Sequence, residues 1–296
     1  MGIYATFRPV ISDHTPALAG VPTETGVGHV TCENPLAVRT AAVNVPRMSD
    51  ITVTTLAERP HLQGAMDEMP ETWNEFVRHD LVGWTHYPRI ADELPEYTLV
   101  ATDGSGAVVA KAMSVPFMLH AKGRGELPAG GWGRVLQWAF SDLKYGRTPD
   151  TVSAIEISVA NGQQGRGLSY TLLGAMRDNA RRRGFSEVVA PVRPNAKHLE
   201  PRTPIEEYAF RVRDEDGLPT DPWLRVHVRA GGVIEKVAPV SMCVNGTLEQ
   251  WRAWTGQPFD EAGEVEIPGA LVPVHCAPER DYAVYVEPNV WVRHAL

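Results

Sequence analysis

The chain has 296 residues, of which 43% are hydrophobic and 22% are charged, a composition typical of a globular protein with one large or two small domains. Its formal net charge of −8 argues against nucleic acid as a partner, because proteins that bind phosphate backbones usually carry a basic surface. No apolar run approaches the ~18 residues that would span a membrane, which argues against a membrane protein.

The first 47 residues are rich in Pro, Thr, Gly and Ala and show no sustained hydrophobic period. We therefore expect a disordered tail, or a start site placed too far upstream, followed by one domain that spans residues 48–296. This stretch also lacks the basic and apolar regions of a secretory signal. Cys32, Cys243 and Cys276 are isolated and odd in number, so neither a disulfide framework nor a zinc site is expected. These observations favour a cytoplasmic protein.

The first part of this domain alternates strands with short helices. Ile51–Leu56 has the β-branched alternation of a first strand, and Asp103-Gly104-Ser105-Gly106 has the composition of a hairpin turn. Trp84, His86 and Tyr87 form an aromatic cluster that belongs either to the core or to a substrate pocket. The other elements predicted here are strands at Tyr97–Thr102, Ala107–Val115 and Thr151–Val159, and helices at Pro60–Met66, Glu71–Arg78 and Val135–Tyr145.

A glycine-rich turn follows the strand that ends at Val159. The turn, Gln164–Ser169, leads into a segment with an apolar face at three-to-four spacing, which ends at Arg181–Arg183 and Gly184 as helices commonly do. Two glycines separated by one residue let successive backbone N–H groups face one point, and a helix N-terminus adds its positive dipole end. The pattern therefore predicts a strand, an anion-binding loop and a helix.

The rest of the chain is predicted to complete a sheet. Pro191 lies inside the predicted strand Glu187–Val192 and cannot donate to a ladder, so its neighbour must be absent or splayed away. Residues 195–219 are polar and rich in proline, and we expect a loop over a cleft. Asp221-Pro222 is a strong helix start. The remaining predicted elements are helices at Trp223–Ala230 and Leu248–Trp254, and strands at Val233–Val240, Ala270–His275 and Tyr282–Val292.

The turn Gln164-Gly165-Arg166-Gly167-Leu168-Ser169 resembles the Q/R-x-x-G-x-G/A signature of the GNAT N-acetyltransferase superfamily. Ser169 departs from the final Gly/Ala, and Asn161 stands where proline is common. The resemblance implies an α/β (α+β) fold with a mixed, mostly antiparallel sheet, splayed central strands and flanking helices, here with a C-terminal strand extension from about residue 241. It also implies a site for acetyl-CoA as co-substrate at Val159, Asn161, Gln164, Gly165, Arg166, Gly167, Leu168, Ser169 and Asn195.

The resemblance also directs attention to three candidate catalytic residues. GNAT enzymes commonly have a tyrosine acid four residues before a glycine, and counting back from Gly231 leads to His227, whose unperturbed pKa near 6.5 is far below that of a phenol. A protonated His227 would act as an acid and a neutral one as a base. Tyr208 is an alternative acid, and Glu156 is the carboxylate that best fits the base. No metal-ligand spacing occurs among the histidines, so no metal is expected.

Three functions remain open at this stage. The first is transfer of an acyl group, most simply acetyl from acetyl-CoA, to a small-molecule amine by direct attack in a ternary complex. The second is a GNAT-like malonyl-thioester decarboxylase that uses His227, with the donor on CoA or on an acyl carrier protein and with Arg225 or Arg229 holding the malonyl carboxylate. The third is a non-catalytic module that binds acyl-CoA. The sequence leaves the acceptor, the acyl group and the oligomeric state open.

Overall fold

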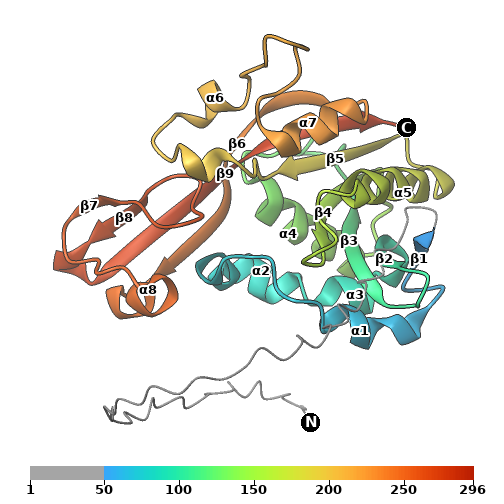
Figure 1. Cartoon of the computed structure of the whole chain (residues 1–296), viewed down its shortest axis with the longest axis horizontal. Coiled ribbons are helices and arrows are strands. Elements are labelled where there is room, and N and C mark those ends of the chain that lie inside the picture. Colours follow the sequence, from blue (N-terminus) through green and yellow to red (C-terminus); the bar gives the residue numbers. More distant parts are fainter. Residues whose placement is uncertain (1–49) are drawn as a thin grey trace, which may run out of the picture. The chain divides into compact units, whose positions relative to one another are not determined.

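The computed structural model describes residues 50–296, so the expectation of a disordered tail at residues 1–47 lies outside the described residues. Its centre is a nine-stranded sheet in the order β1-β2-β3-β4-β5-β9-β8-β7, and β6 pairs with the other edge of β9 (Figure 1). The strands are β1 (Thr52–Thr55), β2 (Thr98–Thr102), β3 (Val108–Phe117), β4 (Thr151–Val159), β5 (Glu187–Val192), β6 (Val233–Gly246), β7 (Gly263–Val265), β8 (Val274–Ala277) and β9 (Tyr282–Ala295).

Every neighbouring pair in the sheet is antiparallel except β4 and β5, which are parallel. These two strands pair only through Val152 with Val188 and Ser153 with Val189, and then diverge. Pro191 lies in the diverging half of β5, where its missing N–H costs no hydrogen bond to β4. The mixed, mostly antiparallel sheet with splayed central strands is therefore confirmed.

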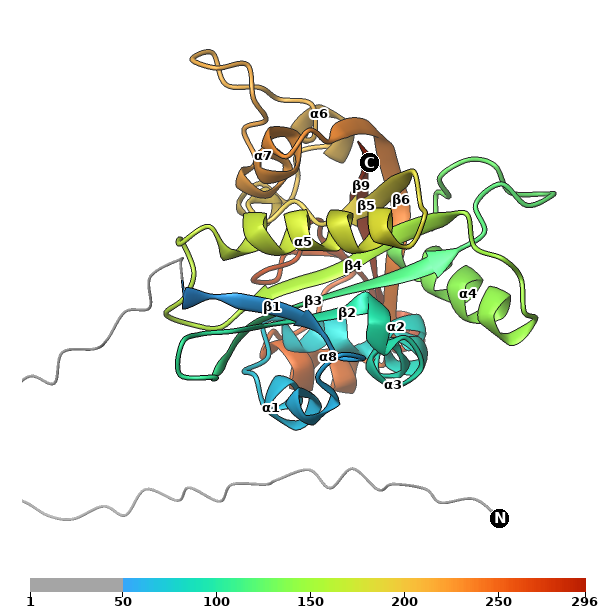
Figure 2. The same cartoon turned by 90° about the vertical axis from the view of Figure 1, so that its right-hand side faces the viewer.

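Helices cover both faces of the sheet. Figure 2 shows α5 and α7 on one side and α1, α2, α3 and α4 on the other. The helices are α1 (Gln63–Asp67), α2 (Leu81–His86), α3 (Arg89–Glu93), α4 (Gly131–Lys144), α5 (Leu168–Arg182), α6 (Ile205–Tyr208), α7 (Pro222–Arg229) and α8 (Leu248–Thr255). The apolar face predicted for α5 is confirmed by the burial of Leu168, Leu172, Met176 and Ala180. No helix among the described residues has both the length and the apolar character needed to cross a membrane.

The C-terminal residues contribute both to the main sheet and to an extension of it. The second half of β9 lies between β5 and β6, while its first half pairs with β8, which in turn carries β7. In Figure 1, β7, β8 and α8 lie at the left, at the opposite end of the sheet from α5. The sequence did not predict β7, whose three residues become a strand only because β8 offers a partner.

Several predicted boundaries were wrong. The segment predicted as a helix at Glu71–Arg78 forms a 3₁₀ helix at Glu75–His79, and the strand predicted at Ala270–His275 is β8, from Val274 to Ala277. Residues 195–219 are more structured than a loop, with a 3₁₀ turn at Lys197–Leu199 and with α6. The buried Lys197 fixes this segment, because its Nζ donates to the carbonyls of three other residues, Glu200, Pro201 and Leu271.

Candidate active site

A cavity of about 690 Å³ lies where β4 and β5 splay apart. It brings together the glycine-rich loop, one face of α7, and residues from β6 and β9. The lining residues are Thr72, Trp73, Trp132, Ala154, Ile155, Glu156, Ile157, Ser158, Val159, Gln164, Gly165, Gly167, Ser169, Tyr170, Ala190, Pro191, Val192, Arg193, Asn195, Pro222, Trp223, Val226, His227, Met242, Glu287 and Asn289.

The glycine-rich loop forms one end of the cavity and has the geometry of an anion site. Gly165 and Gly167 have φ angles of +73° and +81°, which L residues with side chains rarely adopt. The space where their Cβ atoms would stand is open. Helix α5 begins directly after Gly167, and no side chain caps its N-terminus, so backbone N–H groups of the first turn remain available to a ligand. The loop therefore fits a phosphate or pyrophosphate group.

The residues predicted for the donor site do not all line the cavity. Val159, Gln164, Gly165, Gly167, Ser169 and Asn195 do. Asn161, Arg166 and Leu168 do not, because Asn161 is exposed on a turn, Arg166 donates to Gln163, and Leu168 is buried in the core. Gln164 Nε2 donates to the carbonyl of Val159 at 3.4 Å and so joins the loop to the end of β4.

Glu156 is buried in the wall of the cavity beside four donors. Its Oε1 accepts hydrogen bonds from Trp73 Nε1 at 3.0 Å and from Ser158 Oγ at 2.7 Å. Its Oε2 accepts from the Tyr87 hydroxyl and lies 3.7 Å from Lys111 Nζ. Burial and the Glu156 charge raise the pKa of Tyr87 well above its usual value, so its hydroxyl stays protonated and keeps donating.

A short chain of hydroxyls joins this buried carboxylate to the cavity. Thr72 Oγ1 lies 2.9 Å from Ser158 Oγ, which donates to Glu156. Thr72 is exposed and Ser158 is buried, and both line the cavity. The four donors surround the Glu156 oxygens, and of these donors the Ser158 hydroxyl both donates to the carboxylate and can exchange a proton with a molecule in the cavity. Ser158 is therefore the hydrogen-bonded path between Glu156 and a bound molecule.

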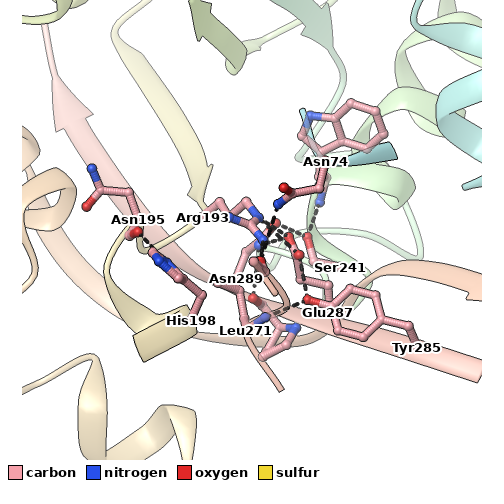
Figure 3. Close-up of polar contacts among 12 residues, drawn as sticks. Asn74, Arg193, Asn195, His198, Ser241, Leu271, Tyr285, Glu287 and Asn289 are labelled. Carbon is pink, nitrogen blue, oxygen red and sulfur yellow. Dashed lines mark hydrogen bonds and ion pairs between the residues drawn. The ribbon is translucent and has the colours of Figure 1, made fainter. Parts of the chain in front are cut away.

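The opposite wall holds a second buried carboxylate, that of Glu287 on β9. Figure 3 shows Arg193, which follows β5, pointing toward Glu287. Arg193 Nε lies 3.0 Å from each Glu287 oxygen, and Nη2 donates to the carbonyl of Gly269 at 2.6 Å. Tyr285 and Asn289 also donate to Glu287. Glu287 is fully buried, whereas the Arg193 side chain is 21% exposed and lines the cavity.

His227 reaches the cavity from α7 and is held from behind by His294 of β9. The two rings meet at 2.9 Å between Nδ1 of His227 and Nε2 of His294. Burial, and then the neighbouring His294, lower the pKa of His227 to about 3. Burial and the Arg177 guanidinium lower the pKa of His294 to about 4. Both rings are therefore neutral at pH 7, which favours a neutral role for His227 over the protonated acid considered from the sequence.

The structure places Tyr208, Arg225 and Arg229 outside the lining of the cavity. Tyr208 donates its hydroxyl to Asp221 at 3.0 Å, where Asp221 also caps α7, and it does not line the cavity. Arg225 donates to backbone carbonyls and Arg229 pairs with an aspartate, and neither lines the cavity. These positions fit structural roles. Among residues 50–296, no group of three or more metal-ligating side chains comes together.

Sequence reasoning missed most of the cavity wall opposite the loop. Trp73 and Trp132 lie with ring centroids 6.4 Å apart, and Tyr87 is 6.4 Å from Trp132. Of the aromatic cluster noted in the sequence, Tyr87 reaches Glu156, whereas Trp84 is 74% exposed. The position of Arg193 directly after a predicted strand was the one local signal for a residue near the splay.

The neutral histidine pair predicts acid sensitivity. Unfolded histidine protonates near pH 6.5, while both folded rings stay neutral down to about pH 4 or below. As the pH falls below about 6.5, the unfolded chain binds protons that the folded chain does not. Each ring then lowers the free energy of unfolding by about 1.4 kcal/mol for every unit by which the pH falls. Urea unfolding at about pH 7 and about pH 5.5 measures this decrease in the free energy of unfolding. The double variant His227→Phe, His294→Phe should show a flatter pH dependence, and an unchanged slope would contradict the assignment.

Comparison with known proteins shows which proteins this chain resembles. No family model matches the chain. The arginine N-acetyltransferase avaD of Aspergillus versicolor is 31% identical over 276 residues, covering 83% of this chain and 94% of that protein. The loading GNATL domain of CurA from Lyngbya majuscula has a TM-score of 0.52 at 16% identity, covering 83% of this chain and 97% of that chain. The GphF GNAT-like decarboxylase in complex with isobutyryl-CoA has a TM-score of 0.46 at 16% identity, with coverages of 83% and 98%.

A splayed sheet with a glycine-rich loop at the end of β4 defines an acyltransferase of the GNAT type. The chain belongs to the GNAT N-acetyltransferase superfamily. It is an enzyme, an acyl-CoA-dependent N-acetyltransferase.

Proposed function

We propose that this enzyme transfers the acetyl group of acetyl-CoA to an amine of arginine or of a closely related cationic small molecule, by direct attack in a ternary complex. The observation that carries the proposal is that the loop, the splay, Glu156 and His227 all line one cavity. The similarity to an arginine N-acetyltransferase supports the acceptor class. The net charge of −8 supports a cationic acceptor through long-range attraction.

The donor side of the cavity consists of the loop and the splay. The backbone around Gly165 and Gly167 and the N-terminus of α5 would hold the pyrophosphate. Beyond Ser153 and Val189 the facing edges of β4 and β5 no longer pair with one another. The carbonyls of Ile155 and Val159 accept from Trp132 and Gln164, and other backbone groups along the splay would bind an extended pantetheine arm and donate to a thioester carbonyl.

Glu156 would act as the base through Ser158. An acceptor ammonium gives one proton to the Ser158 oxygen as Ser158 passes its own proton to Glu156 at 2.7 Å. The neutral amine then attacks the thioester carbon, a C–N bond forms, and collapse of the intermediate breaks the C–S bond. One of the two protons on the nitrogen of the intermediate goes to the departing sulfur and the other stays on the amide, so the products are an amide and CoA. This chemistry requires no metal, and we place it in the cytoplasm, consistent with the free cysteines Cys243 and Cys276.

One alternative draws on a specific observation, the partly exposed Arg193 side chain in the cavity wall. A guanidinium in this position could hold the carboxylate of a malonyl thioester, as a decarboxylase would require. The similarity to the loading domain of CurA keeps a donor on an acyl carrier protein within this alternative. Glu287, which already neutralises Arg193, weighs against it.

The test is an acceptor and donor panel with the full chain. CoA release from acetyl-CoA is followed with a thiol reagent, and products are identified by mass. L-arginine is compared with agmatine, which lacks the carboxylate, and with L-citrulline, which lacks the guanidinium charge. We expect acetylated arginine as the product and a loss of at least about tenfold in kcat/KM for citrulline, since one lost charged contact is worth about 1.4 kcal/mol or more.

Three results would overturn the proposal. Acetyl transfer to citrulline as efficient as to arginine would remove the cationic acceptor class. Conversion of malonyl-CoA to acetyl-CoA without any acceptor-dependent transfer would establish the decarboxylase alternative. Binding of acetyl-CoA without turnover across the panel would indicate the non-catalytic acyl-CoA module.

A further inference from the structure

Two imidazole rings are in contact at the cavity, and a guanidinium lies near the second ring. His227 lines the cavity and is 2% exposed, and its Nδ1 meets Nε2 of the fully buried His294 at 2.9 Å. Because the two nitrogens of an imidazole face opposite sides of the ring, Nε2 is the His227 nitrogen left for the cavity. Arg177 of α5 lies close enough to His294 for its charge to lower the pKa of that ring.

The contact between the rings couples their tautomers. A hydrogen bond of this length needs one proton between the two nitrogens, and each neutral ring carries only one proton. If His294 supplies the shared proton, its Nδ1 is bare and His227 carries its own proton on Nε2, facing the cavity. If His227 supplies it, Nε2 of His227 is bare and Nδ1 of His294 carries a proton.

The surroundings of His294 favour the first arrangement. His294 Nδ1 and Arg177 Nε are both buried without a hydrogen-bond partner among the described residues. A proton on Nδ1 would be a buried donor without an acceptor, placed beside a cation. The carbonyl of Ala230 also faces His294, but it forms no hydrogen bond with Nδ1, and Arg177 Nη1 donates to it at 2.6 Å. Arg177 forms no ion pair with an acid among the described residues, and its guanidinium donates only to the carbonyls of Ala230 and Ala295, so no carboxylate neutralises its charge beside His294.

We propose that His294, backed by Arg177, is a positioning residue that holds His227 in the tautomer with Nε2–H directed into the cavity. His227 is then a neutral hydrogen-bond donor toward the thioester or the departing sulfur. It keeps its proton throughout, because removing it would leave an imidazolate. This inference rests on the proposed acetyl transfer, in which the ammonium of the intermediate supplies the proton to sulfur.

A neutral N–H donor fits the environment of His227 better than a proton-transferring acid or base does. The pKa of about 3 leaves almost no imidazolium at pH 7 and makes the ring a poor base for an ammonium. A neutral N–H needs no proton transfer of its own and works where charge develops in the transition state. Trp223 packs edge-on against the His227 ring with centroids 4.8 Å apart, which further limits its rotation.

The direct test reads the tautomer by ¹⁵N NMR of histidine-labelled full-length protein. We expect Nε2 of His227 to show the shift of a protonated ring nitrogen in the wild type, and to respond when CoA is added. In Arg177→Met we expect the bare Nε2 form to become populated. A bare Nε2 in the wild type at pH 7 overturns the proposal. The NMR result does not depend on acetylation activity, so an enzyme that acetylates no acceptor would contradict the proposed function and leave the tautomer assignment to be judged by NMR.

Kinetics supply the second test. His294→Phe should lower kcat about tenfold with little change in the KM for acetyl-CoA, whereas His294→Gln, which keeps an N–H donor, should recover part of the loss. The double variant His227→Phe, His294→Phe should be no slower than His227→Phe alone, because His294 acts through His227. Additive losses in the double variant, or equal losses in His294→Gln and His294→Phe, would show that His294 supports the fold only.

Discussion

Replacement of Glu156 by glutamine should lower kcat by about 10²–10³-fold while leaving the affinity for acetyl-CoA within about twofold, since positioned bases typically contribute 10²–10⁴-fold. The side chain keeps its size and its bonds to Trp73 and Ser158, but an amide cannot take the proton that Ser158 passes on. The loss should therefore appear in turnover and not in donor binding. Steady-state kinetics with arginine and titration calorimetry with acetyl-CoA separate the two quantities.

The pH profile decides whether Glu156 acts as a base. At higher pH a growing fraction of the acceptor is already deprotonated, so the residual rate of Glu156→Gln should rise about tenfold per pH unit below the pKa of the acceptor amine. Glu264→Gln, on β7 and away from the cavity, is the matched control and should behave like the wild type. A Glu156→Gln enzyme with normal turnover would instead show that the carboxylate only anchors Trp73 and Tyr87.

The Ser158→Ala variant tests the path between Glu156 and the acceptor. Without the hydroxyl, the carboxylate loses its direct hydrogen-bonded link to the cavity and one of its four neighbouring donors. We expect a loss in kcat of the same order as that of Glu156→Gln. If Ser158→Ala retains full activity while Glu156→Gln does not, the proton reaches Glu156 by another path.

Local patterns account for the parts of the fold that were predicted well. The bounds of β4 and β5 agree with the sequence prediction because β-branched runs there end at clear turn signals. The loop and α5 combine glycines that require positive φ with an apolar face of regular period. These features depend on residues within a few positions of one another, so they are visible in the chain itself.

The site depends on contacts between distant residues. His227 and His294 are 67 positions apart, Glu156 and Trp73 are 83 apart, and Arg193 and Glu287 are 94 apart. No hydrophobic period in the sequence predicts these pairs. His227 was found through a family motif, but its neutral state follows from burial and from His294, which only the folded chain brings to it. Tyr208 illustrates the converse, because its hydroxyl is taken up by Asp221.

The largest loss of donor affinity should follow from Gly165→Asp, Gly167→Asp in the loop. Each change forces a side chain into a φ above +70° and places a carboxylate where the pyrophosphate would lie. We expect the Kd for CoA and acetyl-CoA to rise at least about 100-fold in titration calorimetry, which corresponds to about 2.7 kcal/mol. Acetyl transfer should fall with it at donor concentrations near the wild-type KM.

Two controls separate the causes of that loss. Gly146→Asp introduces the same charge at another glycine of positive φ, +61°, with equally open surroundings but outside the cavity, and should leave binding unchanged. Gly165→Asn, Gly167→Asn imposes similar backbone strain without the charge, so any affinity that it retains over the aspartates measures electrostatic repulsion of the phosphates. Unchanged affinity in the aspartate double variant would place the donor elsewhere. It would also remove the reason for assigning the splay, and with it His227, to the thioester.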